Sequence, residues 1–167
     1  MVRGFSLLEL LITVVMLSIL LAAAIPDFSQ VTGRETIRSL AGQLQGFIQH
    51  AKSEAVLRNR DLWGHIVWEA DNDSHWRLIL SDSSEPGSGE RLMVLDGREF
   101  HALKLRATFA RDRIQFDGVR GKVSNGSFYF HPDGAGAPEL RLTTSFGASR
   151  VMVCAPEGES YGYPKCD

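Results

Sequence analysis

The feature that most constrains this chain is its N-terminal apolar stretch. Phe5 to Ile25 is a run of 21 residues with no Gly or Pro. An apolar helix needs about 20 residues to cross the hydrocarbon core of a bilayer, so the run predicts a membrane helix. Its strongly polar members are Ser6, Glu9, Thr13 and Ser18. A charged side chain inside a membrane is costly and usually faces a partner, so Glu9 marks this span as unusual.

Three interpretations of the stretch compete. It could be a secretory signal peptide, with Arg3 as the basic region and Ala22–Ala24 as a small-residue cleavage site. It could be an ordinary single-pass anchor. It could also be a segment that waits in the membrane and later packs against copies of itself. Only the third interpretation explains why the span contains the charged residue Glu9.

The first 26 residues resemble the N-terminus of type IV pilins and pseudopilins. The resemblance is carried by Gly4-Phe5-Ser6-Leu7-Leu8-Glu9, the apolar run that follows, and Pro26. It implies that prepilin peptidase removes residues 1–4 by cutting between Gly4 and Phe5, and that Phe5 is then N-methylated. It also implies that Glu9 pairs with the N-terminal amine of a neighbouring subunit during assembly. The expected location is the inner membrane, with the C-terminal domain in the periplasm, and later a filament.

Beyond Pro26, which should bend the helix, the helical pattern continues. Apolar residues recur at spacings of three and four, which is typical of an amphipathic helix. They are Ile37, Leu40, Leu44, Phe47, Ile48, Ala51 and Ala55. We therefore expect one helix from Phe5 to Arg58, about 80 Å long, whose half at 26–60 lies against a sheet. Gly42 and Gly46 are expected to permit close approach of another element.

Residues 61–167 predict an antiparallel β domain, so the expected fold class is α+β with a pilin-like arrangement. Short runs rich in β-branched and aromatic residues alternate with turn residues, and the first two form a hairpin signal. The predicted strands are 62–69, 75–81, 91–95, 104–109, 113–116, 122–124, 127–131, 139–144 and 150–154.

The remaining composition argues against catalysis. The formal net charge is −2 and 44% of residues are apolar, a neutral globular balance. The five histidines are scattered singly, without the spacing of metal ligands. No nucleophile elbow, phosphate loop or zinc-protease motif is present in the sequence. We expect no enzyme activity, no metal and no cofactor.

Two further stretches resemble the GspH/FimT group of minor pilins and pseudopilins. One is the helix end Ala51–Arg60. The other is Ser149–Cys154, where the group often has Gly-Arg-x-Arg-x-Cys. Here Ser149 replaces the Gly and Met152 replaces the second Arg. The resemblance implies a possible DNA contact at this Arg-rich end, and the cations left for it here are Arg141, Arg150 and Lys165.

The two cysteines, Cys154 and Cys166, would lie in the periplasm, an oxidising compartment where a disulfide is expected. The loop they would close resembles the C-terminal disulfide loop of type IV pilins more than the ends of secretion pseudopilins. The predicted function is therefore a minor pilin that primes assembly of a type IV pilus, with adhesion, motility or DNA uptake downstream. The alternatives are a minor pseudopilin of a type II secretion system and a DNA-binding competence pilin. The expected partners are other pilins, prepilin peptidase and the inner membrane.

Overall fold

The computed structural model describes residues 6–69, 75–134 and 136–167, and gives only the backbone of residues 22–32. Its first element is the helix α1 (Leu7–Arg58), a single assignment of 52 residues. The helix and its C-terminal end are confirmed. The predicted start at Phe5 lies outside the described residues, and so do the turn of the predicted hairpin, between the strands 62–69 and 75–81, and the side chain of Pro26.

The chain divides into two compact units, residues 1–35 and residues 36–167. In the first unit the described side chains from position 6 to position 21 are all exposed. The second unit contains the rest of α1 and all the strands, and it has its own hydrophobic core. The expected α+β fold class, a long helix packed on an antiparallel β domain, is thus confirmed.

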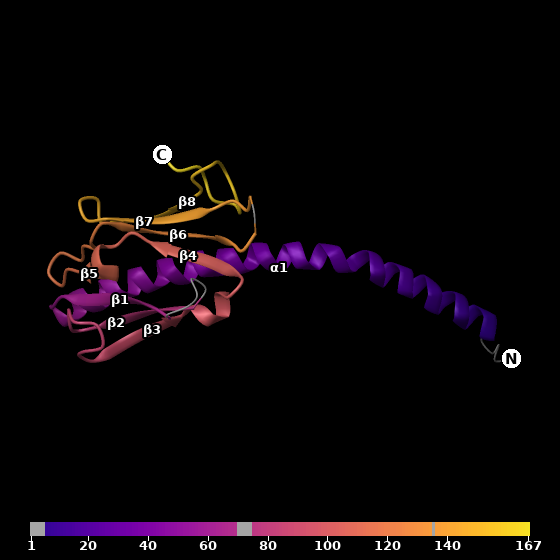
Figure 1. Cartoon of the computed structure of the whole chain (residues 1–167), viewed down its shortest axis with the longest axis horizontal. Helices are drawn as coiled ribbons and strands as arrows, with labels where there is room; N and C mark the ends of the chain where they lie inside the picture. Colours follow the sequence, from indigo (N-terminus) through magenta and orange to yellow (C-terminus); the bar gives the residue numbers. More distant parts are fainter. Residues whose placement is uncertain (1–5, 70–74, 135) are drawn as a thin grey trace. The chain divides into compact units, whose positions relative to one another are not determined.

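The β domain consists of two four-stranded antiparallel sheets, shown for the second unit in Figure 1. The first sheet has the order β3-β2-β1-β5, and the second β4-β6-β7-β8. The strands are β1 (Leu62–Trp68), β2 (Trp76–Ser81), β3 (Arg91–Asp96), β4 (Leu103–Ala107), β5 (Arg113–Phe116), β6 (Gly126–Pro132), β7 (Leu140–Ser145) and β8 (Arg150–Cys154). Two short 3₁₀ turns, η1 (Gly97–Phe100) and η2 (Ala110–Asp112), flank β4.

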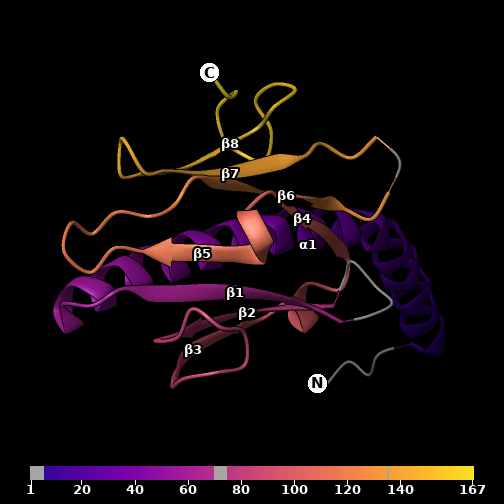
Figure 2. The same cartoon turned by 60° about the vertical axis from the view of Figure 1, so that its left-hand side comes forward.

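The C-terminal half of α1 runs between the two sheets, and Figure 2 shows β1 and β5 side by side in front of it. The helical stripe predicted from the sequence is buried in one core together with side chains from both sheets. The most deeply buried aromatic members of this core are Trp76, Phe116, Phe128 and Phe130. Burying such side chains removes apolar surface from water, which is the main favourable contribution to folding.

Two expectations from the sequence are wrong. The predicted strand at 122–124 is a single bridge between Val123 and Phe116, because the chain there turns back after β5 instead of adding a strand. The close approach expected at Gly42 and Gly46 is also wrong. A Cβ atom built at either glycine would meet no other atom within 4 Å, since both lie on the exposed side of the helix.

The end of α1 is attached to the first sheet through Asp61. Its carboxylate oxygens accept hydrogen bonds from the backbone N–H of Gly118, at 2.9 Å, and from the Gln115 side chain, also at 2.9 Å. Gly118 packs so closely here that a Cβ would lie 2.4 Å from backbone atoms of Arg60. Backbone cannot swing away as a flexible side chain can, so this position requires glycine.

We predict that Gly118→Ala lowers the free energy of unfolding by about 1–3 kcal/mol, the usual cost of overpacking. Gly147→Ala is the matched control, because no atom lies within 4 Å of a Cβ at that position. Chemical denaturation of both variants and the parent provides the measurement. Equal stability of Gly118→Ala and the control would contradict the close packing.

Candidate functional site

Residues 6–21 of α1 present an apolar surface on every side. Leu7 is 83% exposed and Leu20 68%, and the apolar side chains between them are also exposed. A helix that is hydrophobic all round is stable only when lipid or other protein covers it. Thr13 and Ser18 do not change this, because their hydroxyls donate to helix carbonyls of Leu10 and Val14, both at 2.8 Å.

Glu9 is the acidic residue in the first turn of α1, and it is exposed. A carboxylate at a helix N-terminus is favoured by the positive end of the helix dipole. No ion pair joins Glu9 to another of the described residues.

No helix within the described ranges is both long and apolar enough to cross a membrane. Gly4 and Phe5, the predicted cleavage and methylation positions, lie outside the described residues. The side chains of residues 22–25, at the other end of the predicted span, lie outside them too.

The C-terminal loop is closed by a disulfide between Cys154 and Cys166, whose Cα atoms lie 5.0 Å apart. Backbone hydrogen bonds reinforce it: Ala155 N–H donates to Pro164 C=O at 2.8 Å, and Cys166 N–H donates to Ala155 C=O at 3.0 Å. The Arg38 side chain on α1 also donates to the Tyr161 carbonyl at 2.8 Å. The loop is thus attached at its base to β8 and at its tip to the helix.

The structure separates the three cations predicted to contact DNA. Arg141 on β7 lies opposite Cys154 on β8, with a guanidinium nitrogen 3.8 Å from the sulfur. Lys165 is near the same end of β8, since it forms a bridge with Ala155. Arg150 lies at the other end of β8, four residues from Cys154 and so about 13 Å away along the strand. Arg150 therefore does not join the other two in one cluster.

A different set of side chains is brought together on the second sheet. We call this set the outer face, and its members are Lys104, Arg106, Tyr129, His131 and Arg141. Strand pairing aligns Arg106 with Tyr129 and Tyr129 with Arg141. The Arg106 guanidinium lies 4.1 Å from the Tyr129 ring centre, a cation–π contact. The sequence analysis did not predict this face. Apolar and polar residues alternate within each strand, as in Leu103-Lys104-Leu105-Arg106, and this alternation indicates that one side of the sheet is polar.

Acidic side chains partly offset the outer face. Glu139 lies 3.9 Å from Arg106, and Asp133 lies 3.8 Å from Lys104. These separations are at the long end of ion-pair geometry, and exposed pairs of this kind contribute little. The face thus keeps a positive character with one aromatic ring at its centre.

Among the described residues, two carboxylates have clearly perturbed pKa values, and both stabilise turns. Hydrogen bonds from the Arg98 side chain and backbone lower the pKa of Asp96 to about 2. A hydrogen bond from the backbone N–H of Arg120 lowers the pKa of Asp117. Neither is paired with a second acid or a base of the kind that general acid–base catalysis requires.

Comparison with known proteins identifies two family models in this chain. Residues 40–154 match the family described as type II transport protein GspH, and residues 1–25 match the prokaryotic N-terminal methylation motif. The chain is 28% identical over 173 residues to the pilin-like protein PilA1 of Thermus thermophilus, covering 95% of this chain and 96% of the relative.

The fold is similar to that of a solved minor pilin, and a solved minor pseudopilin matches more weakly. The type IV minor pilin FimU of Pseudomonas aeruginosa matches with a TM-score of 0.55 at 22% identity, over 80% of this chain and 96% of that one. The minor pseudopilin EpsH of the Vibrio cholerae type 2 secretion system matches with a TM-score of 0.48 at 14% identity, over 71% of this chain and 96% of that one.

We predict that replacing both cysteines, Cys154→Ala with Cys166→Ala, lowers the free energy of unfolding by about 2–4 kcal/mol. The loop between them should also become more susceptible to protease. Limited proteolysis followed by mass spectrometry measures this, with the parent protein in a reducing agent as the matched comparison. Unchanged cleavage within residues 155–165 in both samples would show that the disulfide does not hold the loop.

Proposed function

We propose that this chain, which belongs to the GspH family of type II transport proteins, is a minor pilin that joins a type IV pilus through its N-terminal helix. The observation that carries the proposal is the exposed apolar helix with one carboxylate, Glu9, in its first turn. Such a surface suits insertion in the inner membrane as a single span, followed by transfer into a bundle of like helices. The role is structural and assembly-related, with no catalytic activity.

In this proposal, prepilin peptidase cuts between Gly4 and Phe5 and the new N-terminus is methylated. The positive amine of Phe5 then pairs with Glu9 of a neighbouring subunit. Leaving one member of a buried ion pair without its partner costs about 3–5 kcal/mol, so only the correct axial register would be stable. The match to the N-terminal methylation motif over residues 1–25 supports this sequence of events.

The C-terminal disulfide loop favours a pilus over a secretion filament, because it resembles the C-terminal loop of type IV pilins more than the ends of secretion pseudopilins. The loop is tied to β8 and to Arg38, so it forms an ordered projection from the second sheet. The likeness to a pilin-like protein over nearly the whole chain points the same way. The alternative, a minor pseudopilin of a type II secretion system, is favoured by the description of the matched family. Deleting the gene separates them: loss of pili supports the first and loss of exoprotein release supports the second.

DNA binding is a second candidate function, favoured by the outer face. Four side chains that carry or can carry positive charge surround one tyrosine there, and phosphate binding needs several cations close together. The tyrosine ring could stack on an unpaired base. The three cations expected from the sequence contribute only Arg141 to this face.

We predict that Glu9→Val leaves membrane insertion and methylation of Phe5 unchanged but lowers incorporation into filaments more than tenfold, because the amine of the neighbour is left unpaired. Mass spectrometry of the mature N-terminus and immunoblotting of sheared filaments measure the two steps. Ser18→Ala is the matched control, since that hydroxyl bonds within its own helix. An N-terminus at Ile25, or parental incorporation of Glu9→Val, would contradict the proposal.

For the DNA candidate, we predict that the full chain in detergent micelles shifts the mobility of DNA at low salt. Replacing Arg106 and Arg141 together by Gln should reduce the slope of log affinity against log salt by about two. Arg91→Gln, on the exposed first position of β3, is the control. Absence of a shift at low salt, or an equal loss in the control, would refute DNA binding by the outer face.

A further inference from the structure

Among the strand edges of the described β domain that lack a neighbouring strand, one on β1 and one on β4 face the same cavity. β5 pairs with β1 only from Leu62 to His65. The described part of the chain provides no strand beside the rest of that edge of β1, from Ile66 to Trp68. β4 is the outermost strand of the second sheet, and it pairs only with β6. The chain crosses from one sheet to the other through η2, and this crossing leaves both edges open.

The hydrogen-bond register shows which groups these edges present. Glu69 N–H donates to His75 C=O at 2.9 Å, so the β1 residues that bond to β2 are the odd-numbered ones. In an antiparallel pair the residues between such positions direct N–H and C=O to the opposite side. Ile66 and Trp68 therefore direct their backbone groups toward the open edge.

The same argument applies to β4. Thr108 N–H donates to Ser127 C=O at 2.9 Å, and Asp133 N–H donates to Ala102 C=O at 3.0 Å. The even-numbered residues of β4 therefore bond to β6, and Leu103, Leu105 and Ala107 direct their N–H and C=O outward. Their side chains do not compete for these groups, since Leu105 is only 4% exposed and packs in the core.

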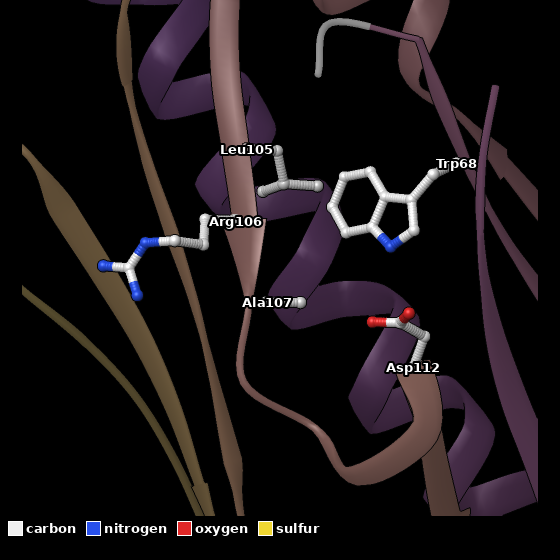
Figure 3. Close-up of a pocket in the computed structure, with 5 residues that line it drawn as sticks. All are labelled: Trp68, Leu105, Arg106, Ala107 and Asp112. Atoms are coloured by element: carbon white, nitrogen blue, oxygen red, sulfur yellow. The ribbon is translucent and has the colours of Figure 1, made fainter. Parts of the chain in front are cut away.

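The cavity between the edges has a volume of about 390 Å³ and is lined by Trp68, Leu105, Arg106, Ala107 and Asp112. Figure 3 shows the Trp68 ring pointing toward Leu105 and the Asp112 carboxylate turned into the opening from below. The Arg106 guanidinium points away, toward its contact with Tyr129. The cavity thus combines an apolar wall, the unpaired backbone N–H and C=O groups of the β1 and β4 edges, and the negative charge of Asp112.

We propose that this cavity, which we call the inter-sheet groove, binds an extended segment of another protein that adds a strand to the edge of β4. Strand addition uses main-chain hydrogen bonds for affinity and alternate side chains for specificity. The bound segment carries an apolar side chain that packs on Trp68 and Leu105. It carries a Lys or Arg next to that residue, which pairs with Asp112.

Strand-forming polypeptide is the ligand class that fits both edges. The outward groups on β4 recur at every second residue, about 6–7 Å apart, which is the spacing that a second strand supplies. The Asp112 carboxylate favours a cationic side chain on the bound segment. It is turned into the opening, and no ion pair joins it to any other described residue. The groove lies wholly within residues 36–167 and does not involve Glu9. Its loss would therefore leave the proposed filament assembly unchanged.

The test uses the full chain in detergent micelles and a defined probe, the peptide acetyl-Thr-Val-Lys-Val-Thr-amide at millimolar concentration. Amide hydrogen exchange is followed by NMR at individual residues of β4. Without peptide, the Leu105 and Ala107 amides should exchange at least tenfold faster than those of Lys104 and Arg106, since only the latter bond to β6. With peptide, exchange at Leu105 and Ala107 should slow. Slow exchange without peptide, or no slowing with it, would overturn the proposal.

Two variants and two control peptides separate strand addition from other binding. Ala107→Pro removes one outward N–H at an edge position that tolerates proline, and should weaken binding about tenfold without unfolding the chain. A peptide with both valines N-methylated should also fail to bind. A Lys→Glu peptide should bind roughly two- to fivefold more weakly, and Asp112→Asn should remove that difference. Equal binding of the N-methylated peptide, or a charge preference that persists in Asp112→Asn, would refute the proposed mode.

Discussion

The constraint on which this structure depends is that one helix must satisfy two environments. From position 36 onward, α1 buries a single apolar stripe, including Ile37 and Leu44, against both sheets. Before that, from position 6 to position 21, its side chains are exposed on every side. Hydrophobic surface of that extent is unfavourable in water, so the first part requires lipid or other helices. The β domain covers the apolar stripe of α1 from position 36 onward, and the membrane or the filament must cover positions 6 to 21.

The C-terminal half of α1 also explains how two separate sheets form one domain. Neither sheet covers the other completely, and the helix supplies the apolar surface on which both pack. Hydrogen bonds also attach this part of the chain to its neighbours: Asp61, just after α1, accepts from Gly118 beyond β5, and Arg38 on α1 donates to the Tyr161 carbonyl of the C-terminal loop. The polar side chains of the outer face, and Asp112 in the inter-sheet groove, lie outside this core, whereas Leu105 belongs to both the groove and the core.

The elements of the fold could be predicted from the sequence because their signals are local. The spacing of Ile37 to Ala55 indicated the buried stripe, and β8 lies where it was predicted, at 150–154. The outer face could not be predicted, because the alignment of Arg106, Tyr129 and Arg141 depends on the order β4-β6-β7. Strand order is set by long-range packing, which single segments do not reveal. The predicted cations failed to cluster for the same reason, since Arg150 and Arg141 lie at opposite ends of one strand pair.

An open strand edge is also a liability, because it can pair with any exposed strand, including another copy of itself. The sequence of β4 opposes that outcome. In an antiparallel pair of two β4 edges centred on Leu105, Lys104 of one copy would lie directly opposite Arg106 of the other. Like charges directly opposite are destabilising, so self-pairing is disfavoured. Asp112, at the mouth of the same groove, attracts cations instead. An edge that repels its own copy and presents a carboxylate to incoming strands has the features of a selective binding site.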